Sequence, residues 1–77
     1  MDIKTAVNGM WALVDRSKLP EDHEAYGKDH LRAMLVMMAN GEITGDKAHR
    51  WLGWIQGCVC VGQGASLEDM KQVNKKA

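Results

Sequence analysis

Histidine, cysteine and acidic residues are the side chains of this sequence that could do chemistry, and their spacing decides whether they can act together. His23 and His30 are seven residues apart, two turns along one helical face, with acidic residues beside both. His23 and Glu24 begin the HExxH zinc motif, but Gly27 stands where the second histidine belongs. We therefore interpret both histidines as partly buried side chains bonded to carboxylate or carbonyl groups, and we expect no metal.

The two thiols offer no clear catalytic arrangement either. Cys58 and Cys60 point about 200° apart on a helix, although on a strand they would point the same way. A nucleophilic cysteine needs a neighbouring base, and His49 lies nine residues before Cys58 on another face. We expect the cysteines to be small core residues, the protein not to be an enzyme, and no cofactor to be bound.

Basic residues at the start of the third predicted helix permit a DNA-binding interpretation. Lys47 and Arg50 follow a turn at residues 40–44, as in a helix-turn-helix motif. Arg50, however, shares its side of the helix with apolar and small residues that do not suit base-edge readout. Ten basic residues also balance ten acidic ones, which leaves little attraction for phosphate. A small DNA-binding regulator that uses Lys47 and Arg50 is therefore the alternative hypothesis.

The same helix carries a pattern that is typical of protein recognition. Arg50, Trp54, Gly57 and Val61 recur at i, i+4, i+7 and i+11, so they form one face. Tryptophan and arginine are frequent anchors of protein interfaces, and the glycine leaves a notch beside them. We expect this face to bind a partner or a second subunit. The pattern leaves open whether Trp54 belongs to that interface or to the core.

Hydrophobic periodicity predicts the elements that carry these residues. Pro20, Asn40-Gly41 and Gly62-Gln63-Gly64 divide the chain into four segments. Apolar stripes at helical spacing predict helices over about 2–16, 21–39, 45–61 and 67–75. Residues 58–61 could alternatively form a short strand. We predict one all-α domain over residues 1–77, a compact bundle of three main helices and a short C-terminal helix.

Two segments carry more apolar surface than a small bundle readily covers. Residues 33–39, the end of the second predicted helix, are apolar on every side, so we expect that end to be buried all round. The third helix has no fully polar side, and it contains Gly53 and Gly57, each of which costs stability in a helix. We interpret the third helix as the central element of the bundle, and we expect a homodimer to cover the surplus.

Length and composition limit the classes of protein further. The chain has 77 residues, a formal net charge of +0 and two cysteines, too few to staple a secreted mini-protein. Its first residues lack the charged and apolar regions of a signal peptide, and no apolar run is long enough to span a bilayer. We expect a cytoplasmic protein with no membrane contact.

One stretch of sequence also resembles a known group of proteins. The run GEITGDKAHRWLGWIQG, residues 41–57, followed by the closing SLEDMKQVNKK, is similar to short uncharacterised accessory proteins of tailed phages and prophages. The resemblance covers about a third of the chain and includes no catalytic motif. It implies a small accessory protein that works inside a bacterial host by occupying a larger host or phage protein. It assigns no functional residue.

Overall fold

The computed structural model describes all residues from 1 to 77 and contains five helices and no strand. They are α1 (Ile3–Asn8), α2 (Trp11–Arg16), α3 (Lys28–Ala39), α4 (Gly45–Val61) and α5 (Leu67–Lys76). α1 and α2 follow one another as a broken pair, so the chain forms three main helical segments and a short last helix. The all-α bundle predicted from the sequence is confirmed.

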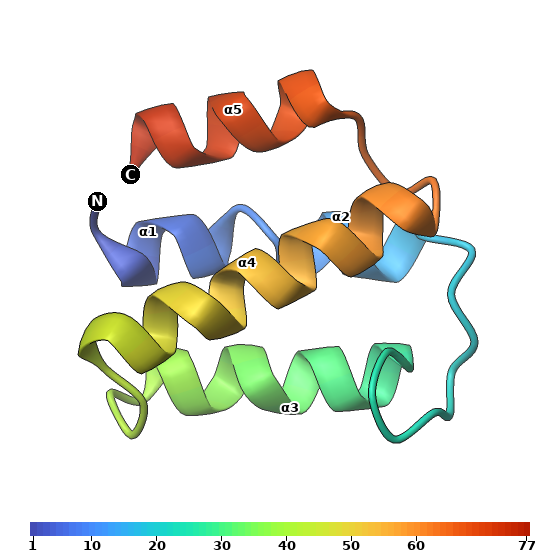
Figure 1. Cartoon of the computed structure of the whole chain (residues 1–77), viewed down its shortest axis with the longest axis horizontal. Helices are drawn as coiled ribbons and strands as arrows, with labels where there is room; N and C mark the ends of the chain where they lie inside the picture. The colour runs from blue at the N-terminus through green and yellow to red at the C-terminus, as the bar shows by residue number, and fades with distance from the viewer.

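The helices form two layers. α5, the α1–α2 pair and α3 lie side by side, and α4 crosses in front of them (Figure 1). α1 packs against both α3 and α5, whereas α4 packs on α1 and α3. The two ends of the chain meet, because the N–H of Asp2 donates to the carbonyl of Ala77 at 2.8 Å. α4 therefore packs on the other helices through one side, leaves its outer side open, and supplies five of the fourteen residues of the buried core.

The core lies between α4 and the layer behind it. Each of the first four helices contributes residues at the spacing expected from the apolar stripes, and α5 contributes a single methionine. Leu19, Ile43 and Trp51 are half-buried against this cluster. The fourteen buried residues of the cluster are Ala6, Val7, Met10, Val14, Leu31, Met34, Leu35, Met38, Ala48, Leu52, Ile55, Cys58, Val59 and Met70.

The first predicted helix, over about 2–16, is in fact two helices separated at Gly9 and Met10. The N–H of Met10 donates to the carbonyl of Val7, three residues back, so the chain turns more tightly than an α-helix. Gly9 has a low helix propensity, and a Cβ there would lie 3.2 Å from Val73 of α5. The break thus falls where α5 crosses closely. It leaves Val7, Met10 and Val14 buried.

The second helix begins at Lys28, so the predicted start near residue 21 is wrong. Residues 20–27 instead form turns, in which the N–H groups of Lys28 and Asp29 donate back to Pro20 and Glu21. The imidazole Nδ1 of His23 accepts from the N–H of Ala25 at 3.1 Å. The His23 side chain therefore accepts a backbone N–H that a carbonyl group would accept in a helix. Proline followed by acidic residues here precedes a turn, not the first turn of a helix.

The far end of α3 also differs from expectation. Leu35 and Met38 are buried, but Val36 is 46% exposed. The apolar end of this helix is therefore not buried all round within one chain, because α4 and the α1–α2 pair reach only part of its circumference.

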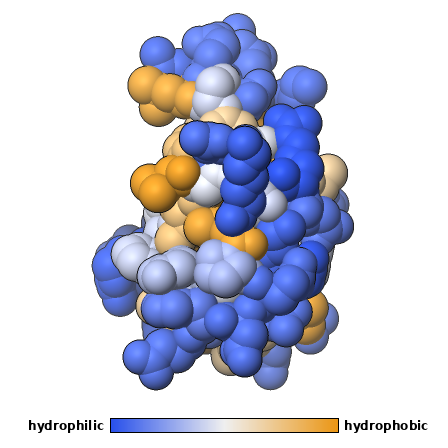
Figure 2. Space-filling view, turned by 90° about the vertical axis from the view of Figure 1, so that its right-hand side faces the viewer, coloured by the Kyte–Doolittle hydropathy of each residue, from blue (hydrophilic) through white to orange (hydrophobic).

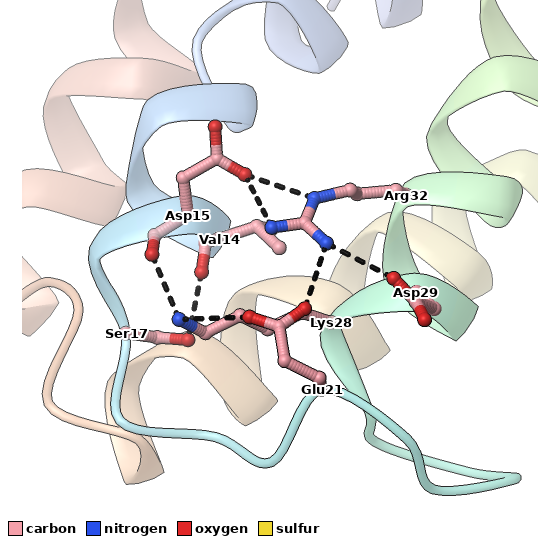
Figure 3. Close-up of polar contacts among 7 residues, drawn as sticks. All are labelled: Val14, Asp15, Ser17, Glu21, Lys28, Asp29 and Arg32. Atoms are coloured by element: carbon pink, nitrogen blue, oxygen red, sulfur yellow. Dashed lines mark hydrogen bonds and ion pairs between the residues drawn. The ribbon is translucent and has the colours of Figure 1, made fainter.

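An ion-pair network fastens the segment between α2 and α3. The guanidinium of Arg32 contacts Asp15 at 2.8 Å, Glu21 at 3.1 Å and Asp29 at 3.1 Å (Figure 3). Its hydrogen bonds to Asp15 and Glu21 raise the pKa of Arg32. The ammonium of Lys28 donates to the backbone carbonyl of Asp15 at 2.8 Å and lies 3.7 Å from Glu21. The turn segment is thereby tied to both helices that flank it.

The last two helices begin where the sequence indicates. Thr44 precedes α4 with an extended backbone, although its side chain makes no capping hydrogen bond. Ser66 and Asp69 form a complete capping box at α5: the N–H of Asp69 donates to the Ser66 hydroxyl at 3.1 Å, and the N–H of Ser66 donates to the Asp69 carboxylate at 2.8 Å.

The capping box makes the stability of α5 sensitive to acid. Hydrogen bonds from Ser66 lower the pKa of Asp69 below its ordinary value of 3.8. A lowered folded-state pKa contributes stability that is present above the ordinary value and is lost as pH falls through the folded-state value. We expect Asp69→Asn to lower the melting temperature at pH 7 and to reduce the loss that wild type shows below about pH 4.

Thermal unfolding followed by circular dichroism at pH 7 and pH 3 measures both effects. Glu68→Gln is the matched control, because it removes a carboxylate from the same turn and leaves the capping box intact. Equal acid sensitivity in Asp69→Asn and wild type would contradict this assignment.

Candidate interaction surface

The outer face of α4 carries all four residues that the sequence predicts for an interface. Arg50, Trp54, Gly57 and Val61 are all exposed. Val61 is 83% exposed and Trp54 is 49% exposed, so two apolar side chains of this face stand in solvent one beyond the other along the helix. The structure thus brings these residues onto one open face, because α4 turns its buried stripe toward the layer behind it.

Trp54 is held in place by the turn segment before α3. Its indole Nε1–H donates to the backbone carbonyl of Ala25 at 2.8 Å, so the ring leans from α4 toward this segment. The segment is itself ordered by His23, whose imidazole stacks on Tyr26 with ring centroids 3.6 Å apart. Trp54 is thus half-exposed, its indole is held by a hydrogen bond, and it lies outside the buried core cluster.

Beside Trp54 lies an apolar hollow of about 500 Å³. Five residues of α4 line it, namely Gly53, Trp54, Gly57, Cys58 and Val61, together with Leu19 and Tyr26 from the segment before α3. Burial raises the pKa of the Cys58 thiol, which keeps it protonated. No charged side chain lines this hollow, so it suits an apolar occupant.

A smaller hollow lies on the other side of α4, toward α5. Gly57 lines both hollows, and Leu67, which is 69% exposed, stands at the rim of this second one. A pair of amides fixes the helix–helix contact here: Gln56 donates to Asn74 at 2.7 Å, and Asn74 donates back at 3.2 Å. Figure 2 shows separate hydrophobic groups, in orange, mainly along the left side of a largely hydrophilic surface.

Gly53 and Gly57 are the two glycines that neither packing within the chain nor a positive φ explains. Each glycine inside a helix costs about 1 kcal/mol relative to alanine. At Gly27 and Gly64 an added Cβ would lie 2.3 and 2.5 Å from backbone atoms, so the chain itself requires glycine there. At Gly53 and Gly57 nothing lies within 4 Å of an added Cβ. Packing within the chain therefore gives no reason for glycine at these two positions.

The other candidate residues are not brought together. His30 is exposed on α3, contrary to expectation, and His23 is half-buried in the turn segment. No group of three or more histidine, cysteine or acidic side chains is placed to hold a metal ion.

Cys58 and Cys60 lie on α4, which is helical through its last turn, so the strand alternative is wrong. The ammonium of Lys47 lies 5.6 Å from the Trp51 ring centroid, over its face.

Sequence reasoning missed the residues that other segments bring to this surface. Leu19, Tyr26 and Leu67 come from outside α4, and no spacing within α4 could indicate them. Only the position of Tyr26 had a signal in the sequence, namely His23 and Gly27. The sequence pattern predicts a helix for these two residues, but they form the tight turn before Lys28 that places Tyr26 beside Trp54.

Replacing the glycines with alanine tests whether this face is open in the isolated chain. In dilute protein we expect Gly53→Ala and Gly57→Ala each to raise the free energy of unfolding by up to about 1 kcal/mol, because helix propensity improves and nothing is displaced. Gly64→Ala should instead lower it by about 2 kcal/mol or more, since its Cβ would clash with the carbonyl of Leu13. Urea unfolding measures all three, and destabilisation by Gly53→Ala would show that this face is already covered.

No helix combines the length and the apolar character needed to cross a membrane. Comparison with protein-family models, with curated proteins and with solved structures finds no match to this chain. Function is therefore inferred from the side chains and the geometry of the chain itself.

Proposed function

We propose that this chain is a small non-enzymatic protein-interaction module that works through the outer face of α4. The observation that carries the proposal is the apolar hollow beside Trp54, whose lining includes two glycines and the exposed side chains of Trp54, Tyr26 and Val61. Preorganised aromatic and aliphatic anchors around a notch are typical of the central part of protein interfaces. Arg50, on the same face, adds a planar hydrogen-bond donor at one end.

The composition of the hollow supports recognition rather than catalysis. Tyr26 and Cys58 are the titratable residues that line it, and the thiol is kept protonated by burial. Catalytic sites instead bring together groups whose pKa values are tuned for proton transfer or nucleophilic attack. The proposal accordingly assigns binding to this surface and no reaction.

We further propose that the protein acts in the cytoplasm of a bacterial host, as a phage or prophage accessory protein that modulates or inhibits a larger host or phage protein. The resemblance of residues 41–57 and of the closing helix to such proteins supports this setting, and the balanced charge of the chain suits a protein partner. We also propose that the chain forms a homodimer.

Two tryptophan variants separate binding from folding. Trp54→Ala should weaken association by about 2 kcal/mol or more and leave the helix content intact, because half of the side chain already faces solvent. Trp51→Ala should lower the free energy of unfolding by about 2 kcal/mol or more, because its ring packs against the core. Circular dichroism measures folding, and titration against a partner captured from bacterial lysate and then purified measures binding.

Val61→Ser is the second binding variant, since Val61 is almost fully exposed and its loss should not affect folding. A captured protein that binds wild type, Trp54→Ala and Val61→Ser equally would contradict the use of this face.

Binding to DNA is the alternative that the same protein can test. The neutral net charge predicts feeble nonspecific affinity for duplex DNA, around 10⁻⁴ M or weaker at physiological salt. Gel-shift titration measures it. A sequence-selective complex that Lys47→Ala or Arg50→Ala abolishes would overturn the interaction proposal in favour of a DNA-binding regulator.

A further inference from the structure

We propose that the outer face of α4 binds a second copy of this chain, with the two α4 helices antiparallel and a two-fold axis passing beside Gly57. This inference rests on the proposed function, because it names an occupant for the same surface. A second copy and a larger protein partner would then compete for one face, so dimer formation would limit how much of the chain is free to bind.

The face is complementary to itself in this arrangement. A two-fold axis at Gly57 places residues four positions after it opposite residues four positions before it. Val61, which is 83% exposed, then lies over the hollow of the second copy, at the level of Gly53. Each chain thus offers one protruding side chain and one notch, both about 6 Å along the helix from the axis. Gly57, with open space beside it, lets the two backbones approach at the axis.

A parallel arrangement would not use these features. It would place Val61 against Val61 and Gly53 against Gly53, so that the protruding groups collide and the hollows stay empty. It would also align the two helix dipoles in the same direction. In the antiparallel arrangement each dipole opposes the other, and Arg50 lies near the C-terminal end of the second α4, where the dipole is negative.

The available area suits a dimer of this size. α4 crosses the broad face of the molecule (Figure 1), whose extents are 28 Å by 26 Å. In projection these extents enclose about 700 Å², which is of the same order as the ~800 Å² per subunit that a standard interface buries. Because the net charge is +0, two copies of the chain do not repel each other through their overall charge. No charged side chain lines the hollow that Val61 would enter.

Sedimentation equilibrium of wild type and two leucine variants tests the arrangement. Wild type should be monomeric at low micromolar and dimeric at high micromolar concentration. Gly53→Leu adds a side chain to the notch at a position where the Cβ meets no atom of its own chain within 4 Å, and we expect it to raise the dimer dissociation constant at least about tenfold. Gln72→Leu is the control: it adds the same side chain in the groove between α5 and the α1–α2 pair, and it should dimerise as wild type does.

Disulfide trapping tests where the axis lies. In a Cys60→Ala background, Gly57→Cys should form a disulfide-linked dimer when dissolved oxygen oxidises the two thiols, because the residue would face its own copy across the axis. Gln72→Cys in the same background should stay monomeric. Cys58 is buried, and its raised pKa keeps it from competing.

The outcomes separate this inference from the proposed function. A wild type that stays monomeric at high micromolar concentration, a Gly53→Leu variant that dimerises normally, or trapping at Gln72→Cys instead of Gly57→Cys would each overturn the antiparallel dimer. A different protein that binds the monomer and is lost in Trp54→Ala would still support the interaction function. Failure of both self-association and every Trp54-dependent complex would overturn the two together.

Discussion

The structure depends on one constraint: a single helix has to cover the whole front of a three-segment layer. α4 buries Leu52, Ile55 and Val59 against that layer, and α5, the helix that follows, lies in the same layer and does not cover the other side of α4 (Figure 1). A chain of this length cannot supply a third layer, so any apolar residue on the outer face of α4 stays in solvent. Trp54 and Val61 therefore remain available for contacts with another molecule.

The turn segment before α3 converts this bare face into a shaped surface. Arg32 and Lys28 fasten the segment to α2 and α3 through Asp15 and Glu21 (Figure 3), and His23 orders its tip. The tip presents the Ala25 carbonyl to the indole of Trp54 and so fixes one side of the hollow. Surface ion pairs contribute little individually, but here several of them set the position of one loop. The ion pairs of Arg32 and Lys28 thus help to position the segment that borders the apolar hollow beside Trp54.

Much of this fold could be predicted from local signals, and the exceptions share a cause. Ser66 with Asp69, and the apolar stripe of α4, place the last two helices because capping and periodicity act within a few residues. The start of α3 was misplaced because His23 supplies a turn hydrogen bond that a helix would otherwise supply. Arg50, Trp54, Gly57 and Val61 could be grouped by helical spacing, whereas Leu19 and Tyr26 join them only through tertiary contacts that spacing does not encode.

The accessibility of Trp54 tests most directly whether the outer face of α4 is an association surface. The double variant Trp11→Phe, Trp51→Phe leaves Trp54 as the only tryptophan. Acrylamide quenching of tryptophan fluorescence then reports how exposed the Trp54 ring is. If the face associates, quenching should fall as the protein is concentrated from low to high micromolar, or when a captured partner is added, because the half-exposed ring becomes covered. Quenching that stays constant under both conditions would contradict an association surface on α4.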